Sequence, residues 1–184
     1  MDTADILIQL ANTNKIRSFR FCQIDYSKDT DCQNNDIHER LFHRANIGYL
    51  SKDADELSKE MLLNFTNDGF ILNSQVVLQD GSISHLPLMD FDIEVSEASQ
   101  RIVTEVLFAL DIKTGYLLDS GSSYHFIGNE TMKWEVYQAS LYRALLLDPI
   151  TDGRWIAHQL INGSSNLRIG EKNGVTPQLI SIMR

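Results

Sequence analysis

Apolar and polar residues follow one another along the chain in patterns that predict a mixture of strands and helices. Residues 16–24 (IRSFRFCQI) are mostly apolar or β-prone, which predicts a strand. The Asp- and Asn-rich residues 25–36 that follow are typical of a long loop. Between residues 53 and 65 the apolar positions recur at the spacing of an amphipathic helix, and they are Ala54, Leu57, Met61, Leu62 and Phe65.

Hairpin and helix signals dominate the sequence from residue 70 onwards. Residues 70–79 and 86–95 are predicted strands, joined through Asp80-Gly81, a dipeptide that suits a tight turn. Ser96 is the expected N-cap of the next helix. The apolar side of this helix carries Ile102, Val103, Val106, Leu107 and Leu110.

The last third of the chain continues this mixed pattern. Thr131 is the expected cap of a helix that reaches about Leu147. Its apolar stripe is more typical of a core than of a base-stacking surface, and it consists of Trp134, Tyr137, Leu141 and Leu145. The other predicted elements are strands at 116–118, 122–127, 166–170 and 179–183 and a short helix at 155–160. This mixture predicts the α+β class with a largely antiparallel sheet.

Composition limits the class of protein. A chain of 184 residues with 43% hydrophobic and 22% charged residues suits one globular domain. No apolar run approaches the roughly 18 residues of a membrane span. Asp2 and Asp5 lie where a signal peptide would carry positive charge, and Cys22 and Cys32 lack the spacing of a zinc site. We therefore expect a cytoplasmic protein with reduced thiols and no membrane partner.

Charge is distributed unevenly along the chain, whose net charge is −9. Residues 1–120 hold 10 Lys and Arg and 20 Asp and Glu, a balance of −10, whereas residues 121–184 hold 6 and 5, a balance of +1. A ligand with phosphate groups is therefore expected to bind in the last third. An acidic surface that serves only solubility explains the bias equally well.

The sharpest local feature is the segment LMDFDIE at 88–94. In a strand, Asp90 and Asp92 share one face while Phe91 and Ile93 pack on the other. Two neighbouring carboxylates on a mostly buried strand repel each other unless a cation lies between them, and oxygen ligands suit Mg²⁺ or Mn²⁺. The alternative is a half-exposed strand whose polar face happens to be acidic.

A second feature is the segment DSGSSYHFIG at 119–128. Ser123 and His125 would share one strand face, and a hydroxyl beside an imidazole suits a phosphate chain. The alternative is a Ser-rich turn beside a structural histidine.

A third feature combines PITDGRW at 149–155 with NLRIGEKNG at 166–174. Asp152 is expected either as a helix N-cap or as a further acidic ligand. Arg168 lies within an apolar strand and therefore needs a carboxylate or phosphate partner, and Lys172 follows in a turn.

In this order, the four motifs resemble the archaeo-eukaryotic primase superfamily, especially its primase-polymerase branch. The acidic pair corresponds to Asp90 and Asp92, the SxH motif to Ser123-Tyr124-His125, and the third acid to Asp152. The downstream basic segment is similar to Arg168 and Lys172. The resemblance covers about residues 70–177.

The resemblance implies a fold and a set of roles. Residues 1–69 would form a small N-terminal αβ subdomain, and residues 70–184 an RRM-like subdomain that holds the motifs. Divalent cations, Mg²⁺ or Mn²⁺, would be held by three acids, which are Asp90, Asp92 and Asp152. The triphosphate of the nucleotide would be bound by Ser123, His125, Arg168 and Lys172.

Three functions are consistent with this resemblance. The first is a metal-dependent nucleotidyltransferase of the DNA primase or polymerase type, which transfers nucleotides from NTP or dNTP to a 3′-hydroxyl. Its other partners would be single-stranded or primer-template nucleic acid and a protein such as a helicase or a mobile-element or defence component. The second is a weak or inactive module that binds nucleotide or nucleic acid ends within a larger assembly. The third is a phosphohydrolase that uses the same acids.

The remaining basic and imidazole groups carry no motif. Few residues are available as a nucleic acid track in so acidic a chain, and they are Arg143, Arg154 and Arg184. The other histidines are expected to be structural or surface groups, and they are His38, His43, His85 and His158.

Overall fold

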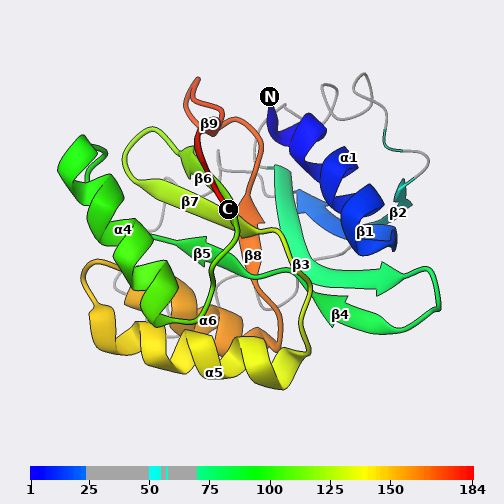
Figure 1. Ribbon diagram of the computed structural model, residues 1–184. Helices are drawn as coiled ribbons and strands as arrows, with labels where there is room; N and C mark the ends of the chain where they lie inside the picture. Colours follow the sequence, from blue (N-terminus) through cyan, green and yellow to red (C-terminus); the bar gives the residue numbers. More distant parts are fainter. Residues whose placement is uncertain (24–49, 55–56, 58–69) are drawn as a thin grey trace, which may run out of the picture.

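In the computed structural model, the described part of the chain forms two antiparallel β-sheets and the helices that flank them (Figure 1). The structure describes residues 1–23, 50–54, 57 and 70–184. The α+β class predicted from the sequence is confirmed. The predicted loop at 25–36 and most of the predicted helix at 53–65 lie outside the described residues.

The first sheet forms around the long strand β3 (Phe70–Leu78). Its strand order is β2 (Leu50–Asp53), β1 (Ile16–Gln23), β3 and β4 (Ile83–His85), and β8 (Asn166–Arg168) also pairs with β3. Helix α1 (Thr3–Asn14) precedes β1 and was not predicted. It begins with a capping box in which Asp2 and Asp5 bond each other's backbone N–H groups.

The second sheet has the strand order β5 (Leu88–Asp90), β7 (Tyr124–Gly128), β6 (Gly115–Asp119) and β9 (Gln178–Met183). Helix α4 (Glu97–Ala109) connects β5 to β6 and begins at Ser96, the predicted N-cap. Because β7 is antiparallel to both β5 and β6, these two strands run parallel with β7 between them. This arrangement is the split β-α-β unit of ferredoxin-like folds.

Some predicted elements differ from the structure. The predicted strand at 86–95 is shorter, since only Leu88–Asp90 forms β5, which pairs with β7 in the second sheet, and the hairpin with β3 is completed by the earlier strand β4. Pro87 lies between β4 and β5, where its missing N–H cannot continue a ladder. The helix expected from Thr131 begins later, as α5 (Trp134–Ala144) with Lys133 at its N-cap, and a 3-10 turn (Leu145–Leu147) follows it.

The short helix predicted at 155–160 is longer in the structure, where α6 extends from Gly153 to Asn162. The predicted turn at Asp80-Gly81 is confirmed, because Gly81 there adopts a φ of 83° and its N–H donates to the Leu78 carbonyl at 2.9 Å. Pairing of β6 with β7 confirms the second predicted hairpin.

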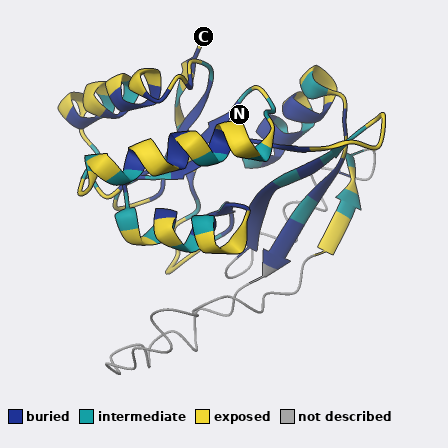
Figure 2. Cartoon of the chain, turned by 90° about the horizontal axis from the view of Figure 1, so that it is seen from below, coloured by how far each residue is buried: buried dark blue, intermediate teal, exposed yellow. Residues whose placement is uncertain are grey.

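Two clusters of buried apolar side chains lie beneath these elements. The first joins α1, β1 and β3 to residues of β6 and β7, including Tyr116 and Ile127. The second lies among α4, α5 and α6 and includes Tyr137 and Leu141, which confirms the predicted core stripe of α5. Each helix turns a buried side inward and an exposed side outward (Figure 2). A subdomain division at residue 69 stays a prediction.

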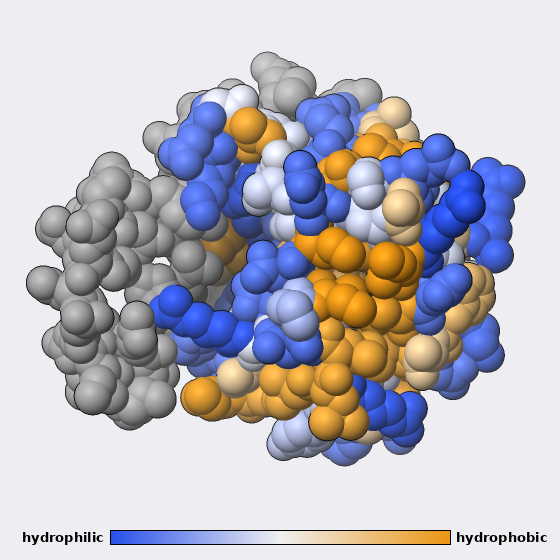
Figure 3. Space-filling model, turned by 90° about the vertical axis from the view of Figure 1, so that its left-hand side faces the viewer, coloured by the Kyte–Doolittle hydropathy of each residue, from blue (hydrophilic) through white to orange (hydrophobic). Residues whose placement is uncertain are grey.

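Apolar side chains also reach the surface, on the face where α4 and the end of α5 lie (Figure 3). The most exposed of them is Leu146, at 84%, in the 3-10 turn after α5. Among the described residues, no helix is both long enough and apolar enough to cross a membrane.

Candidate active site

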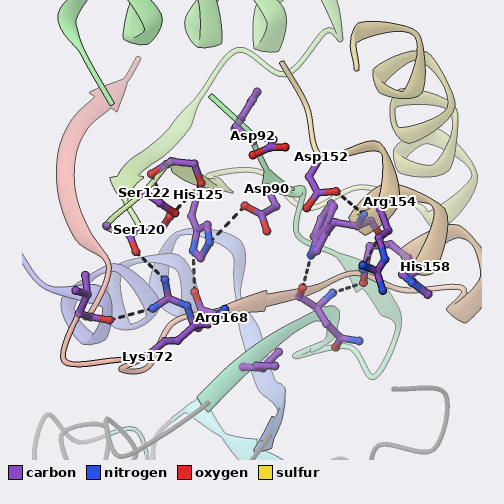
Figure 4. A pocket seen from close by; sticks show the side chains of 18 of the residues that line it. Asp90, Asp92, Ser120, Ser122, His125, Asp152, Arg154, His158, Arg168 and Lys172 are labelled. Atoms are coloured by element: carbon purple, nitrogen blue, oxygen red, sulfur yellow. Dashed lines mark hydrogen bonds and ion pairs between the residues drawn. The ribbon is translucent and has the colours of Figure 1, made fainter. Parts of the chain in front are cut away.

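A cleft of about 730 Å³ lies where β5, β7, β8 and α6 meet (Figure 4). All seven residues that the sequence singled out line it: Asp90, Asp92, Ser123, His125, Asp152, Arg168 and Lys172. They are drawn from strands, a turn and a helix terminus that are separated by up to 82 positions along the chain. The fold therefore brings together the motifs that the sequence placed only in order.

Backbone pairing next to β5 assembles the three acids. The N–H of Asp152 donates to the carbonyl of Asp90 at 3.2 Å, and the N–H of Asp92 donates to the carbonyl of Ile150 at 3.0 Å. Phe91, between the two acids, forms a bridge with Thr151 and is 1% exposed in the second core. The alternation expected of this segment is thus present, with Asp90 and Asp92 on the cleft side.

His125 lies directly opposite Asp90 in the pairing of β5 with β7. Its Nδ1 lies 2.9 Å from the carbonyl oxygen of Arg168, so Nδ1 carries the hydrogen and donates. In the neutral ring Nε2 is then an acceptor, and it lies 3.5 Å from Oδ1 of Asp90. Only a protonated Asp90 carboxyl can supply a hydrogen to this contact while the ring is neutral.

Electrostatics favour the same protonation states. Burial, and next the nearby Asp152, raise the pKa of Asp90 to about 7. Burial, and next the positive charge of Arg168, lower the pKa of His125 to about 3. A strongly raised pKa in an acid that lines a cleft marks the residue as a candidate for function, because functional sites often hold acids in environments that disfavour their charge.

A tight turn between β6 and β7 forms the rim of the cleft near Ser123. The N–H of Ser120 donates to the Ser123 carbonyl at 2.9 Å, and Asp119 accepts from the N–H of Gly121 at 2.7 Å. Tyr124 points to the other side of the strand and is fully buried, where its hydroxyl bonds the N-terminus of α4. Ser123 and His125 therefore share the cleft side, as their spacing predicted.

The side chain of Arg168 connects two turns through their backbone carbonyls. Its guanidinium donates to Ser120 at 2.7 Å, to Gly170 at 2.9 Å and to Val175 at 3.1 Å. These bonds join the turn at 120–123 to the turn at 170–175, which carries Lys172. The carboxylate or phosphate partner expected for this arginine stays a prediction. The backbone contacts form because the two turns direct their carbonyl groups toward β8.

Asp152 is the N-cap of α6, one of the two roles expected for it, because its side chain accepts from the N–H of Trp155 at 2.8 Å. The sequence assigned no site role to several other residues of the cleft, among them Trp155, His158, Gln159, Asn162 and Asn166. His158, expected to be a structural or surface group, is half-buried on the cleft side of α6. Polar residues at 154, 158 and 162 have the spacing of one helix face, which could have indicated a polar surface. The predicted helix, 155–160, was too short to contain residues 154 and 162.

Carboxylate oxygens are the donors that Mg²⁺ and Mn²⁺ prefer, so the chemistry of Asp90, Asp92 and Asp152 suits such an ion. In the part of the chain that the structure describes, however, no three His, Cys, Asp or Glu side chains lie close enough together to hold one metal. The three acids share one cleft without forming a closed ligand set.

Comparison with known proteins gives the family. Residues 50–180, more than half of the chain, match the family model AEP-like, archaeo-eukaryotic primase 1D-like. The chain belongs to this primase family. All seven predicted site residues of this AEP-like protein lie within the matched range, which confirms the resemblance noted from its motifs. No curated protein and no solved structure matches the chain.

Proposed function

We propose that this AEP-like protein is a metal-dependent nucleotidyltransferase that adds nucleotides from NTP or dNTP to a 3′-hydroxyl of nucleic acid. Membership of the primase family supports the general reaction class. The observation that supports it most directly is the position of Asp90, which lies between Asp152 and His125 and has a pKa raised to about 7. A partly buried acid with a second acid beside it gains most from a divalent cation.

In this proposal Asp90, Asp92 and Asp152 hold Mg²⁺ or Mn²⁺. When bound, the ions neutralise the leaving pyrophosphate and make the 3′-hydroxyl more acidic. The acids must lie on separate backbone segments to surround an ion, and the pairing of 90–92 with 150–152 provides this. The backbone bonds between the two segments keep the carboxylates in place before substrates arrive.

The other wall of the cleft would bind the triphosphate. The hydroxyl of Ser123 and the ammonium of Lys172 supply donors, and Lys172 is exposed at its turn. Arg168 adds positive charge and, through its carbonyl bonds, holds the two turns that carry these donors. Burial keeps the ring of His125 neutral. We therefore assign His125 to orienting the acid and the phosphate, and not to binding the phosphate as a positively charged group.

Primer extension tests this proposal. Purified protein with a labelled primer-template, mixed NTP and dNTP, and Mn²⁺ or Mg²⁺ should extend the primer. Asp92→Asn should lower the rate by at least about a hundredfold, because it removes a charge that the transition state needs. The matched control is Glu94→Gln, an exposed acid two residues further along the same segment that does not line the cleft. Equal rates for Asp92→Asn and the parent would contradict the proposal.

A second function is favoured by one observation, the lack of a closed three-ligand set among the described residues. A protein with this site could bind a nucleotide or a nucleic acid end without polymerising it, as part of a larger assembly. Tight nucleotide binding that gives no extended product with either metal, in protein shown to be folded, would support this function and reject the first.

A further inference from the structure

The cleft has donor groups on two opposite sides with the carboxylates between them (Figure 4). Arg168 and Lys172 lie on one side, near the turn that begins at Ser120. Arg154 and His158 lie on the other side, on α6. The proposed function places a triphosphate at the first side and leaves the second without a ligand.

Three polar residues of α6 line the cleft and are exposed or half-buried, and they are Arg154, His158 and Asn162. They are spaced four residues apart, so they lie along a single face of the helix. Ile156, on the opposite face, is fully buried, and Gln159, at the inner edge of the cleft, is 4% exposed. Gln159 also accepts from the N–H of Asn166 at 2.8 Å, so packing and hydrogen bonding fix the rotation of the helix.

These side chains suit phosphate and sugar oxygens. An arginine, an imidazole and an amide all offer N–H donors, which make most contacts to nucleic acid backbones. Successive members of the row are about 6 Å apart along the axis, so the row extends for about 12 Å. One phosphate would use only part of that length, whereas a strand of several nucleotides would use all of it.

The direction of α6 relates this row to the acids. Asp152 is the N-cap of α6, so the row begins two residues from a carboxylate and leads away from it. Half-buried Trp155, on the same helix, adds an aromatic surface to the cleft, and strand-binding clefts commonly combine aromatic and basic side chains. Of the three arginines considered as a nucleic acid track, only Arg154 lines the cleft.

We propose that the α6 row binds the backbone of a nucleic acid strand whose 3′-hydroxyl lies at Asp90, Asp92 and Asp152. This inference rests on the proposed function and names its second substrate, a primer strand held opposite the nucleotide. Arg154 contacts a phosphate near the 3′ end, and His158 and Asn162 contact the backbone further from it.

The test measures binding of a fluorescently labelled single-stranded oligonucleotide at several salt concentrations, and nucleotide binding separately. In Arg154→Gln we expect about tenfold weaker strand binding and a salt dependence reduced by about one counterion. Affinity for nucleotide should change less than about twofold. Arg143→Gln is the matched control, since Arg143 is an exposed arginine on α5 outside the cleft, and it should retain parental binding.

Strand length adds a second readout. A dinucleotide primer cannot reach the far end of the row, so Asn162→Ala should weaken binding of longer primers and leave the dinucleotide unaffected. Parental strand affinity and salt dependence in Arg154→Gln, or an equal loss in the Arg143→Gln control, would overturn the inference. Failure of the parent to extend primers while strand binding still depends on Arg154 would reject only the catalytic proposal.

Discussion

Asp90 and His125 lie directly opposite each other on β5 and β7, so the register of two short strands joins the acid to the imidazole. Nε2 of His125 lies 3.5 Å from Oδ1 of Asp90, and Nδ1 is bonded to the carbonyl of Arg168. The pKa of Asp90 is raised and that of His125 is lowered, so both groups favour their uncharged forms. The protonation of this pair therefore links pH to both stability and ion binding.

The first prediction concerns the stability of Asp90→Asn. The pKa of Asp90 is about 7 in the fold against an ordinary value of 3.8, so the folded chain keeps a proton that the unfolded chain has lost. Stability contributed by this group is therefore lost as pH rises from about 4 to about 7. Asparagine carries no charge, and the variant should be more stable than the parent by about 1–3 kcal/mol at pH 8.

Urea denaturation at pH 4 and pH 8 checks this expectation. The gain of Asp90→Asn should become small at pH 4, where the carboxyl of the parent is protonated in the folded state and about half protonated in the unfolded state. Glu94→Gln should show little change at either pH, because that side chain is exposed. A stability difference that does not depend on pH would show that the raised pKa of Asp90 is not its cause.

The second prediction concerns metal binding. Asp90 must lose its proton to act as a ligand, so its pKa of about 7 makes ion affinity rise with pH. Mn²⁺ should bind about tenfold more tightly at pH 8 than at pH 6. Calorimetry in two buffers of different ionisation enthalpy should also detect the released proton. Asp90→Asn should bind weakly without this pH dependence, and a parent whose Mn²⁺ affinity is equal at the two pH values would refute the prediction.

Much of this site could be predicted from the sequence because its acids follow local rules. Alternation along a strand places Asp90 and Asp92 together, and the same rule pairs Ser123 with His125. The contact between Asp90 and His125 could not be predicted in this way, because it depends on the register of β5 with β7. The register depends on how two segments far apart in the chain pair with each other, so the local pattern of either segment alone does not predict it.

Other differences also have physical reasons. Residues 86–95 were predicted as the partner strand of residues 70–79, but that partner is β4 at Ile83–His85, and beyond Pro87 the chain enters the second sheet as β5. The guanidinium of Arg168 donates to backbone carbonyls. Every residue has a backbone carbonyl, so the sequence does not indicate which carbonyls accept these bonds. Helix α1 did carry a signal, the acidic cap at Asp2 followed by buried Ile6, Leu7 and Leu10.

The third prediction concerns Arg168→Lys. Lysine keeps the positive charge but lacks the planar fork that reaches Ser120, Gly170 and Val175 together. The two turns should separate, with faster amide exchange at 120–123 and 170–175 and about tenfold weaker nucleotide binding. Hydrogen exchange and a nucleotide titration measure both effects. Unchanged exchange in these turns would show that charge alone explains the role of Arg168.

The fourth prediction concerns acid stability and His85. Burial lowers the pKa of this histidine to about 4, and its Nδ1 lies 3.0 Å from the hydroxyl of Ser74. Between pH 6.5 and about 4 the unfolded chain binds a proton that the folded chain does not, so stability falls as pH falls. Glutamine cannot be protonated, and His85→Gln should reduce the stability loss between pH 7.5 and pH 4.5 by about 1–3 kcal/mol. Parallel pH profiles for variant and parent would contradict this.

The fifth prediction concerns Tyr137, whose hydroxyl supports the strand that carries Asp90. The fully buried hydroxyl accepts from the N–H of Leu88 at 2.9 Å and donates to the Oγ of Ser165 at 2.7 Å, so it ties α5 to β5 and to the start of β8. Phenylalanine fills nearly the same volume but leaves these buried groups without that partner, which should destabilise the protein by about 1–3 kcal/mol in urea denaturation. Tyr142→Phe on the same helix is the matched control, because Tyr142 is 55% exposed and its hydroxyl can bond water. Equal stability of Tyr137→Phe and Tyr142→Phe would show that this hydroxyl does not hold β5 in place.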